Sequence, residues 1–458
     1  MTVSPLANPT YRRLLSAQVT ALVGTGLTTV ALALLAYDLA GGNAGAVLGT
    51  ALALKMVAYV GIAPIAGAIA HRLPRRPFLI ALDLARAGVV VCLPFVTEVW
   101  QIYALIFFLN AFSAAFTPTF QATIPDILPD DAQYTRALSL SRMAYDLENL
   151  LSPTLAALAL AIMSYDVLFT VNGLTFLISA MLVFSVRLPS PKPSLREGGI
   201  WQNLTFGMRS YVNTPRLRGL LALSLAAAMA GAMVIVNTVV YVRDNLGGTQ
   251  VDAAMAFAAS GAGSMIVALI LPRVLDRYPD RPCMLAGGGL LAAGLLIGLI
   301  QPDLSALMFT WFVVGAGGSL VATPAGRLLK RSAVDADRPA LFAAQFALSH
   351  ACWLIAYPLA GYLGSVFNMT VAFTVLALVS LAATVAALRL WPARDVSDLE
   401  HTHESTAHEH MHVHDEHHQH AHEGWEGSEP HRHKHQHDPL THTHTYVIDT
   451  HHSAWPVR

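Results

Sequence analysis

Histidine is concentrated at the C-terminal end of this 458-residue chain, where all of its 20 histidines except His71 and His350 follow residue 400. Many alternate with another residue, so that in an extended chain residues i and i+2 project to the same side. Neutral imidazole is a good ligand for Ni²⁺, Co²⁺ and Zn²⁺, and the carboxylates between the histidines can complete a coordination shell. We expect these tail residues to bind metal: His401, His403, His408, His410, His412, His414, His417, His418, His420, His422, His431, His433, His435, His437, His442 and His444.

Two alternative roles for the tail, residues 393–458, stay open at the level of sequence. A solvated low-complexity segment without a role would have the same composition, and a pH sensor would use the titration of imidazole near about 6.5. The tail has no cysteine and a single methionine, Met411, so it is a poor trap for Cu⁺. Its few apolar residues predict disorder in the absence of metal.

A second set of residues that could do chemistry lies inside apolar stretches. Asp146, Glu148 and Asn149 fall about ten residues into one stretch, and ionisable side chains at membrane depth are costly enough to suggest a function. His350 falls at a similar depth in another stretch, and Asn110 is expected nearby. A carboxylate, an imidazole and an amide can bind a divalent cation, and the carboxylate can carry an exchanged proton.

Lys55 adds a positive charge to the middle of a further apolar stretch. We expect it to neutralise Asp146 or Glu148 until a cation or a proton enters. Structural roles stay open for two of these residues. Asp146 can pair with Arg142 one helical turn away, and His350 can pack among the aromatic residues around it.

The composition of the chain indicates that these residues lie in membrane-spanning segments. Hydrophobic residues make up 54% of the chain and charged residues 12%, against about 25% charged residues in soluble domains. Twelve stretches have the roughly 20 apolar residues that cross a bilayer core. They predict an all-α integral membrane protein with spans at about 14–37, 46–70, 78–97, 99–122, 138–163, 168–187, 218–242, 252–272, 283–301, 304–326, 340–364 and 369–390.

The spans fall into two halves that repeat each other. A short basic loop between two spans recurs 205 residues later (277 − 72 = 205), since Arg72, Pro74, Arg76 and Pro77 return as Arg277, Pro279, Arg281 and Pro282. A recurrence at half the length of the apolar region indicates a duplicated membrane domain. We expect two pseudo-symmetric six-helix halves, residues 1–187 and 218–392.

Basic residues mark one side of the membrane. The loops on that side carry nearly all of the arginine and lysine, whereas Arg243 is the one basic residue in the opposite loops. Because basic loops stay in the cytoplasm, both termini are predicted there. The connection 188–217 lies on the same side. Trp201, Leu204 and Tyr211 recur in it at helical spacing, which predicts an amphipathic helix on the inner membrane surface.

Twelve spans in two repeated halves, with a basic loop after the second span, resemble the major facilitator superfamily of transporters. The family motif Gly-x-Leu-Ala-Asp-Arg-x-Gly-Arg-Arg is matched at Gly67, Ala70, Arg72, Arg75 and Arg76, and in the second half at Asp276, Arg277 and Arg281. The resemblance implies gating residues at His71, Arg72, Arg76, Asp276, Arg277 and Arg281. His71 stands in place of the motif's first-half aspartate, so the latch that this aspartate supports is in doubt there.

A narrower resemblance rests on Pro118 to Pro129 and the run from Ala137 to Pro153. These stretches are similar to the exporter branch that includes macrolide and siderophore efflux proteins. Within that branch, a histidine-rich cytoplasmic tail resembles the nickel-resistance exporters of the NreB type. The resemblance implies a multi-pass protein of the bacterial inner membrane.

These features together predict a transporter and not an enzyme. We expect proton-coupled efflux of Ni²⁺, with Co²⁺ as a second cargo, by alternating access of the two halves. The sequence has no Gly-x-x-x-x-Gly-Lys-[Ser/Thr] phosphate loop, which argues against ATP drive. We expect no resident cofactor, no nucleic-acid partner and a monomeric carrier. The alternative is a drug or siderophore exporter whose tail regulates it in response to metal.

Overall fold

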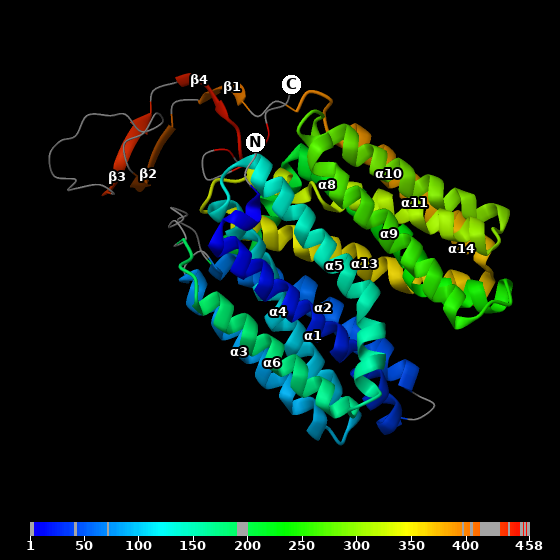
Figure 1. Cartoon of the computed structure of the whole chain (residues 1–458). Helices are drawn as coiled ribbons and strands as arrows, with labels where there is room; N and C mark the ends of the chain where they lie inside the picture. The colour runs from blue at the N-terminus through cyan, green and yellow to red at the C-terminus, as the bar shows by residue number, and fades with distance from the viewer. Residues whose placement is uncertain are drawn as a thin grey trace.

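Long apolar helices form most of the molecule (Figure 1). The structure is a computed structural model that describes residues 4–40, 44–70, 73–189, 200–395, 398–403, 406–412, 431–437, 440–448, 452 and 455. Within these ranges it describes the backbone alone at residues 44–46, 149–150, 153–154, 157, 200–204 and 250 and in the segments between 398 and 445.

The first half contains six long helices, drawn in blue to cyan-green in Figure 1. A short 3₁₀ turn, η1 (Pro5–Ala7), precedes them, and another, η3 (Leu93–Phe95), follows the third. The helices are α1 (Pro9–Ala40), α2 (Ala44–Ala70), α3 (Arg75–Cys92), α4 (Val99–Ile127), α5 (Asp131–Leu160) and α6 (Tyr165–Phe184).

The second half repeats this order with a break in one span. Its helices are α8 (Pro215–Val240), α9 (Gln250–Leu275), α10 (Asp280–Ile297), α11 (Leu304–Ala322), α12 (Ala325–Arg331), α13 (Arg338–Tyr362) and α14 (Met369–Leu390). Two π-helical turns, η4 (Tyr241–Asn245) and η6 (Leu363–Phe367), extend α8 and α13, and the 3₁₀ turn η5 (Gly298–Ile300) follows α10. Helix α4 continues through Pro118, whereas the equivalent Pro324 separates α11 from α12.

The predicted all-α membrane fold is confirmed. Eleven spans are long and apolar enough to cross a bilayer, with α11 and α12 counted as one. Helix α5 is 30 residues long and supplies the twelfth span, although its charged side chains keep it below that level of apolarity. Inside lipid, every backbone polar group must be paired within the segment, which is why these stretches are helical.

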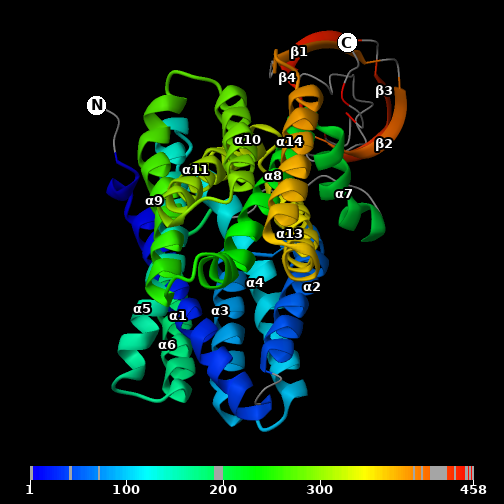
Figure 2. The same ribbon diagram turned by 90° about the vertical axis from the view of Figure 1, so that its right-hand side faces the viewer.

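Helix α7 (Ile200–Asn213) connects the halves and packs on α2 of one half and on α13 of the other. Its apolar face is buried at Tyr211, whose hydroxyl donates to Oε1 of Gln345. A Cβ on Gly207 would lie 2.5 Å from the carbonyl oxygen of Ala340, so only glycine permits this close approach. We call the end of the membrane domain on which α7 packs the linker end (Figure 2).

The halves pack chiefly through α2 with α13 and α5 with α9, and α4 also contacts α13. From the linker end the helices of the two halves diverge, so that α3 and α6 lead away from α10, α11 and α14 (Figure 1). The far ends of the two halves are therefore separated, unlike their linker ends (Figure 1).

The strands of the tail pair with one another, and the pairing of its first strand with its last brings the two ends of the tail together. Strand β1 (Asp398–His403) pairs antiparallel with β4 (Leu440–Thr445), and β2 (Thr406–His412) pairs antiparallel with β3 (His431–His437). The expected disorder of the tail without metal stays a prediction. Alternation with a period of two residues, together with β-branched threonines, suits extended strands even where no apolar face exists.

Candidate transport path

The linker end is held closed by an acidic residue that two arginines share. Asp126, in the last turn of α4, pairs with Arg75 at the start of α3 and with Arg338 at the start of α13, where Arg338 Nη1 lies 2.6 Å from Asp126 Oδ1. The Arg75 and Arg338 side chains are 3% and 12% exposed. Because Arg338 belongs to the other half, this nearly buried cluster joins the halves.

Two residues of helix α12 make further bonds across the same interface. Lys330 Nζ lies 2.6 Å from Asp131 Oδ1 and donates to the carbonyl oxygen of Pro129 at 2.8 Å. Arg327 Nη1 donates to Thr135 Oγ1 at 2.7 Å, while its Nε lies 3.0 Å from Asp280 Oδ1 within the second half. We call the bonds of Asp126, Asp131 and Thr135 to Arg338, Lys330 and Arg327 the linker-end lock.

The predicted gating residues that are described make their contacts inside one half. Arg76 Nη2 donates to the carbonyl oxygen of Phe184 at the end of α6. Arg281, its repeat partner, donates from Nη2 to Leu388 at 3.0 Å and from Nε to Trp391 at 2.9 Å, at the end of α14. Cations at a helix C-terminus stabilise the helix. His71 and Arg72 lie outside the described residues, and Asp276 and Arg277 end α9 in a turn.

Sequence reasoning missed Asp126, Arg338 and Lys330 as members of the lock. Asp126 and Arg338 are 212 residues apart, and local sequence gives no sign of such a distant pair. One signal was available. The repeat offset aligns Arg75 with Asp280 (280 − 75 = 205), and this reversal of charge at an equivalent position predicts opposite partners in the two halves.

Glu148 on α5 and Lys55 on α2 are two of the ionisable residues that the sequence placed inside apolar helices. Both are half-buried, and Lys55 is close enough to Glu148 and to His350 to act electrostatically on both. A Cβ on Gly26 would lie 1.8 Å from Ser152 Oγ and 3.5 Å from Glu148 Oε1. Glycine at position 26 therefore lets α1 pack directly against the face of α5 that carries Glu148.

Aromatic rings from both halves pack together beside Lys55. Lys55 Nζ lies 5.6 Å from the centre of the Tyr59 ring, and Tyr59 packs against Phe346 at 4.9 Å and His350 at 4.7 Å. Nδ1 of His350 lies 2.7 Å from the carbonyl oxygen of Phe346 in its own helix. The predicted packing role of His350 among aromatic rings is thus present, and its second nitrogen remains for another partner.

Asp146 is engaged in a bond between the halves. Its carboxylate lies 2.9 Å from Arg142 Nη2, and it accepts a hydrogen bond from Ser264 Oγ of α9 at 2.6 Å. Arg142 in turn donates to the same Ser264 Oγ from Nε and Nη2, at 3.1 and 3.0 Å. The pairing with Arg142 that the helical spacing allowed is present, and the Asp146 carboxylate is shared between Arg142 and Ser264.

The remaining predicted ligands do not complete a metal site in the described part of the chain. Asn110 is buried, and its amide donates to the carbonyl oxygen of Ile106 in the same helix at 2.7 Å. The side chain of Asn149 lies outside the described residues. Among the described residues there is no group of three or more histidine, cysteine, aspartate or glutamate side chains that could hold a metal ion.

The tail histidines are described only in part. The backbone is described at His401, His403, His408, His410, His412, His431, His433, His435, His437, His442 and His444. His414, His417, His418, His420 and His422 lie outside the described residues. In the β2–β3 pair, His408, His410 and His412 stand opposite His435, His433 and His431.

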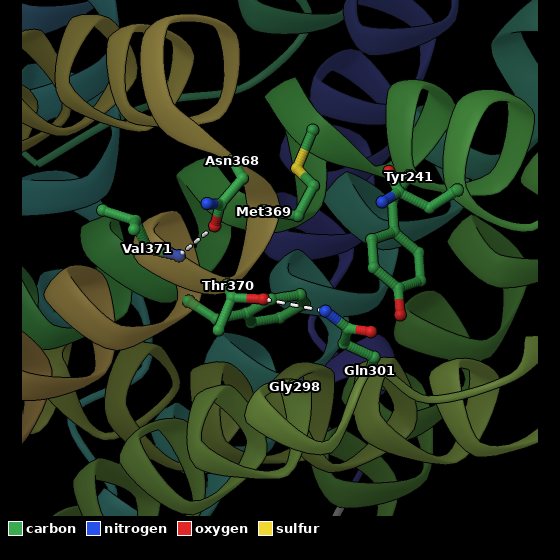
Figure 3. A pocket seen from close by; sticks show the side chains of 9 residues that line it. Tyr241, Gly298, Gln301, Asn368, Met369, Thr370 and Val371 are labelled. Atoms are coloured by element: carbon green, nitrogen blue, oxygen red, sulfur yellow. Dashed lines mark hydrogen bonds between the residues drawn. The ribbon is translucent and has the colours of Figure 1, made fainter.

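A hollow of about 480 Å³ lies in the second half at the end away from α7 (Figure 3). It is lined by η4, by Gln301 after η5 and by the start of α14. Its polar groups satisfy one another, because Gln301 Nε2 donates to Thr370 Oγ1 at 3.1 Å and Asn368 Oδ1 accepts from the Val371 amide at 2.9 Å. All of the residues that line the hollow lie between 241 and 373. The hollow is therefore within the second half and is not lined by Glu148.

A family model described as the Major Facilitator Superfamily matches residues 14–271 and 220–412. The chain belongs to the major facilitator superfamily. Members of this superfamily are transporters and not enzymes, which confirms that part of the prediction. The facilitator is accordingly a multi-pass membrane protein.

Similar proteins agree with this placement. The facilitator is 24% identical over 290 residues to the uncharacterized MFS-type transporter YfiS of Bacillus subtilis, covering 60% of this chain and 68% of the relative. It is 26% identical over 152 residues to macrolide efflux protein A of Streptococcus pyogenes, covering 31% of this chain and 37% of that protein.

Solved structures show the same fold. The human organic anion transporter MFSD10 superimposes with a TM-score of 0.72 at 12% identity, covering 83% of this chain and 99% of that one. A bacterial homologue of the iron transporter ferroportin in an outward-facing state superimposes with a TM-score of 0.70 at 13% identity, again covering 83% and 99%. At these identities the similarity shows the fold alone.

Proposed function

We propose that this facilitator exports divalent transition-metal cations, with Ni²⁺ as the main cargo and Co²⁺ as a second, in exchange for protons. The observation that carries the proposal is the histidine-rich tail, in which β2 and β3 stand in register with three histidines opposite three others. Histidines at opposed positions of two paired strands are a donor set suited to Ni²⁺, Co²⁺ and Zn²⁺. Such a tail would collect metal at the mouth of the path.

The orientation of the carrier follows from its charges. The linker end carries the arginines of the lock, and basic loops stay on the cytoplasmic side, so we place the linker end and both termini in the cytoplasm of a bacterial cell. With the lock closed and the far ends apart, this conformation would face outward. Loading from the cytoplasm would then require the lock to open.

Glu148 is the group that we assign to cation and proton exchange. A divalent cation at membrane depth needs a compensating carboxylate. Lys55 supplies the compensating positive charge while neither cation nor proton is present. Entry of the metal would displace the Lys55 ammonium, and protonation of Glu148 from the outer side would release the metal. His350, within reach of Lys55's charge, is the second ligand that we propose.

A second candidate is export of an organic compound, with the tail as a metal-dependent regulator. The observation that favours it is the aromatic character of the path. Tyr59 and Phe346 lie beside Lys55, and farther along α13 the rings of Trp353 and Tyr357 lie 5.0 Å apart. Such walls suit apolar or planar cargo. The similarity to macrolide efflux protein A over 152 residues points the same way.

Uptake of radioactive Ni²⁺ into inside-out vesicles under an imposed proton gradient separates the two candidates. We expect gradient-dependent uptake by the full chain and by a chain lacking residues 400–458. Glu148→Gln should reduce uptake by at least about a hundredfold, because the exchanged charge is lost. Glu98→Gln, at the exposed start of α4, is the matched control and should transport normally. Absence of Ni²⁺, Co²⁺ and Zn²⁺ uptake by the full chain would favour the organic cargo.

A further inference from the structure

The last described residues of the chain fold back onto the membrane domain as a small buried cluster. Tyr446, Val447, Ile448 and His452 are each less than a tenth exposed. The Tyr446 ring lies 4.5 Å from the ring of His452 and 5.1 Å from that of Trp455. We call these five residues the C-terminal clasp. Burial of aromatic and aliphatic side chains gives the clasp a reason to stay docked.

The clasp docks on α7 and on the first turn of α8. Ser210 Oγ donates to the carbonyl oxygen of Ile448 at 3.3 Å. The guanidinium of Arg216 lies 5.1 Å from the centre of the Trp455 ring, and the Arg216 side chain is fully buried. A desolvated arginine over an indole ring makes a favourable cation–π contact. The clasp therefore covers a charge that would otherwise face water at the linker end.

Arg216 connects the clasp to the linker-end lock. Its Nε lies 3.3 Å from Asp395 Oδ1, and the same carboxylate pairs with Arg331 and accepts from Trp391 Nε1 at 2.9 Å. Arg331 is the last residue of α12. The same short helix carries Arg327 and Lys330, which bond to the first half. Movement of the clasp would thus reach the lock through one shared carboxylate and one short helix.

The histidine-rich tail is a loop closed at both ends on this site. It leaves the membrane domain after Asp395, and the pairing of Asp398 with Thr445 brings its other end back to the clasp. His452 belongs to the clasp and is 5% exposed. An imidazole that binds a metal ion must present a ring nitrogen to that ion. Recruitment of His452 by tail-bound metal therefore competes with its place against Tyr446.

We propose that the C-terminal clasp is an internal restraint on the linker-end lock, released when the tail histidines bind a divalent metal. The docked clasp holds Arg216, Asp395 and α12 in the closed arrangement. Metal binding favours the undocked tail, and by linkage the undocked tail binds metal more tightly. The inference rests on the proposed metal binding by the tail, but it holds whether the exported compound is a metal ion or an organic molecule.

Cross-linking tests the docking directly. Cysteines at Ser210 and Ile448, in a full chain whose three native cysteines are replaced by alanine, should be joined by a short bis-maleimide in membranes without metal. Addition of Ni²⁺ should lower the yield at least about fivefold, which is the size of a typical coupling between two sites. Cysteines at Arg209, whose side chain is exposed, and at Ile448 are the matched control and should cross-link weakly in both conditions. A Ser210 and Ile448 cross-link that is absent, or that Ni²⁺ does not change, would overturn the proposal.

Transport tests the restraint. Trp455→Ala should raise the initial uptake rate at low metal concentration roughly threefold or more, through loss of the cation–π contact, and should leave the rate at saturating metal unchanged. Trp425→Ala, a tail tryptophan outside the described residues, is the control and should behave as the native chain. Equal uptake curves for the native chain and Trp455→Ala would overturn the restraint. If no form transports nickel, the cross-link alone decides, so this inference and the proposed function fail separately.

Discussion

The two halves of the facilitator share one ancestral loop and use it differently at the linker end. Arg76 and Arg281, related by the repeat, both cap the last helix of their half. Their neighbours Arg75 and Asp280 carry opposite charges and therefore recruit opposite partners, Asp126 in one half and Arg327 in the other.

This reversal makes the two rims complementary. The first half presents the acids Asp126 and Asp131, and the second half presents Arg338 and Lys330 to receive them. A strict repeat would give both rims the same charges, so that each rim would have to supply both an acid and a base. Duplication thus supplied the helices and the arginines that cap them. Divergence of a few charged positions supplied the bonds that join the halves at the linker end.

The largest effect is expected from Asp126→Asn. The change leaves the nearly buried guanidinium of Arg75 without the carboxylate that it pairs with, a loss that costs about 3 to 5 kcal/mol in comparable buried pairs, whereas Arg338 keeps Asp335 at 2.7 Å. We expect a lower melting temperature in detergent and faster labelling of a cysteine placed at the linker end. Asp130→Asn, in the same loop but exposed, is the control. Equal melting temperatures for the two variants would mean that Asp126 does not hold the halves together.

An intermediate effect is expected at Arg76 and Arg281, which make the same kind of contact in the two halves. Arg76→Gln and Arg281→Gln each remove a charged donor from a helix C-terminus, which should cost about 1 kcal/mol apiece. Thermal unfolding of the two variants should give similar losses, and labelling at the linker end should stay as in the native chain. A markedly larger loss for one variant would show that the repeat has diverged at the caps as well as at the lock.

The smallest effect is expected from the pair of Lys330 and Asp131, because the Asp131 side chain is 77% exposed. Asp131→Lys should destabilise the closed lock by no more than about 1 kcal/mol, and salt should reduce the difference. Combining it with Lys330→Asp should restore the native behaviour. Failure of the double exchange to restore linker-end labelling would assign Lys330 a role through its bond to the Pro129 carbonyl.

The fold could be predicted from the sequence because membrane spans leave a strong local record. Length, apolar composition and the recurrence of a basic loop are enough to give twelve helices in two halves. The sequence also places Asp146 one turn from Arg142, and the two are paired in the structure. The helices and the ion pair depend on residues that are close in the chain, and the two halves depend on a short pattern that occurs twice.

The site was harder to predict because its contacts join distant segments. The bond from Ser264 to Asp146 and that from Arg338 to Asp126 span 118 and 212 residues, and neither leaves a local pattern. The expected grouping of Asn110 with His350 stays a prediction. A helical asparagine can satisfy its amide on the carbonyl one turn earlier, and Asn110 does so at Ile106.

The polarity of α5 has a consequence for the biogenesis of this protein. Helix α5 lies between the halves and carries the charged residues Arg136, Arg142, Asp146 and Glu148. Each charge disfavours entry of the isolated helix into lipid, by about 2.5 to 3.5 kcal/mol for a charge at the helix centre. The insertion machinery would therefore have to retain α5 until neighbours shield it. Since Ser264 of α9 bonds to Asp146, that span becomes secure only after more than half of the chain has been synthesised.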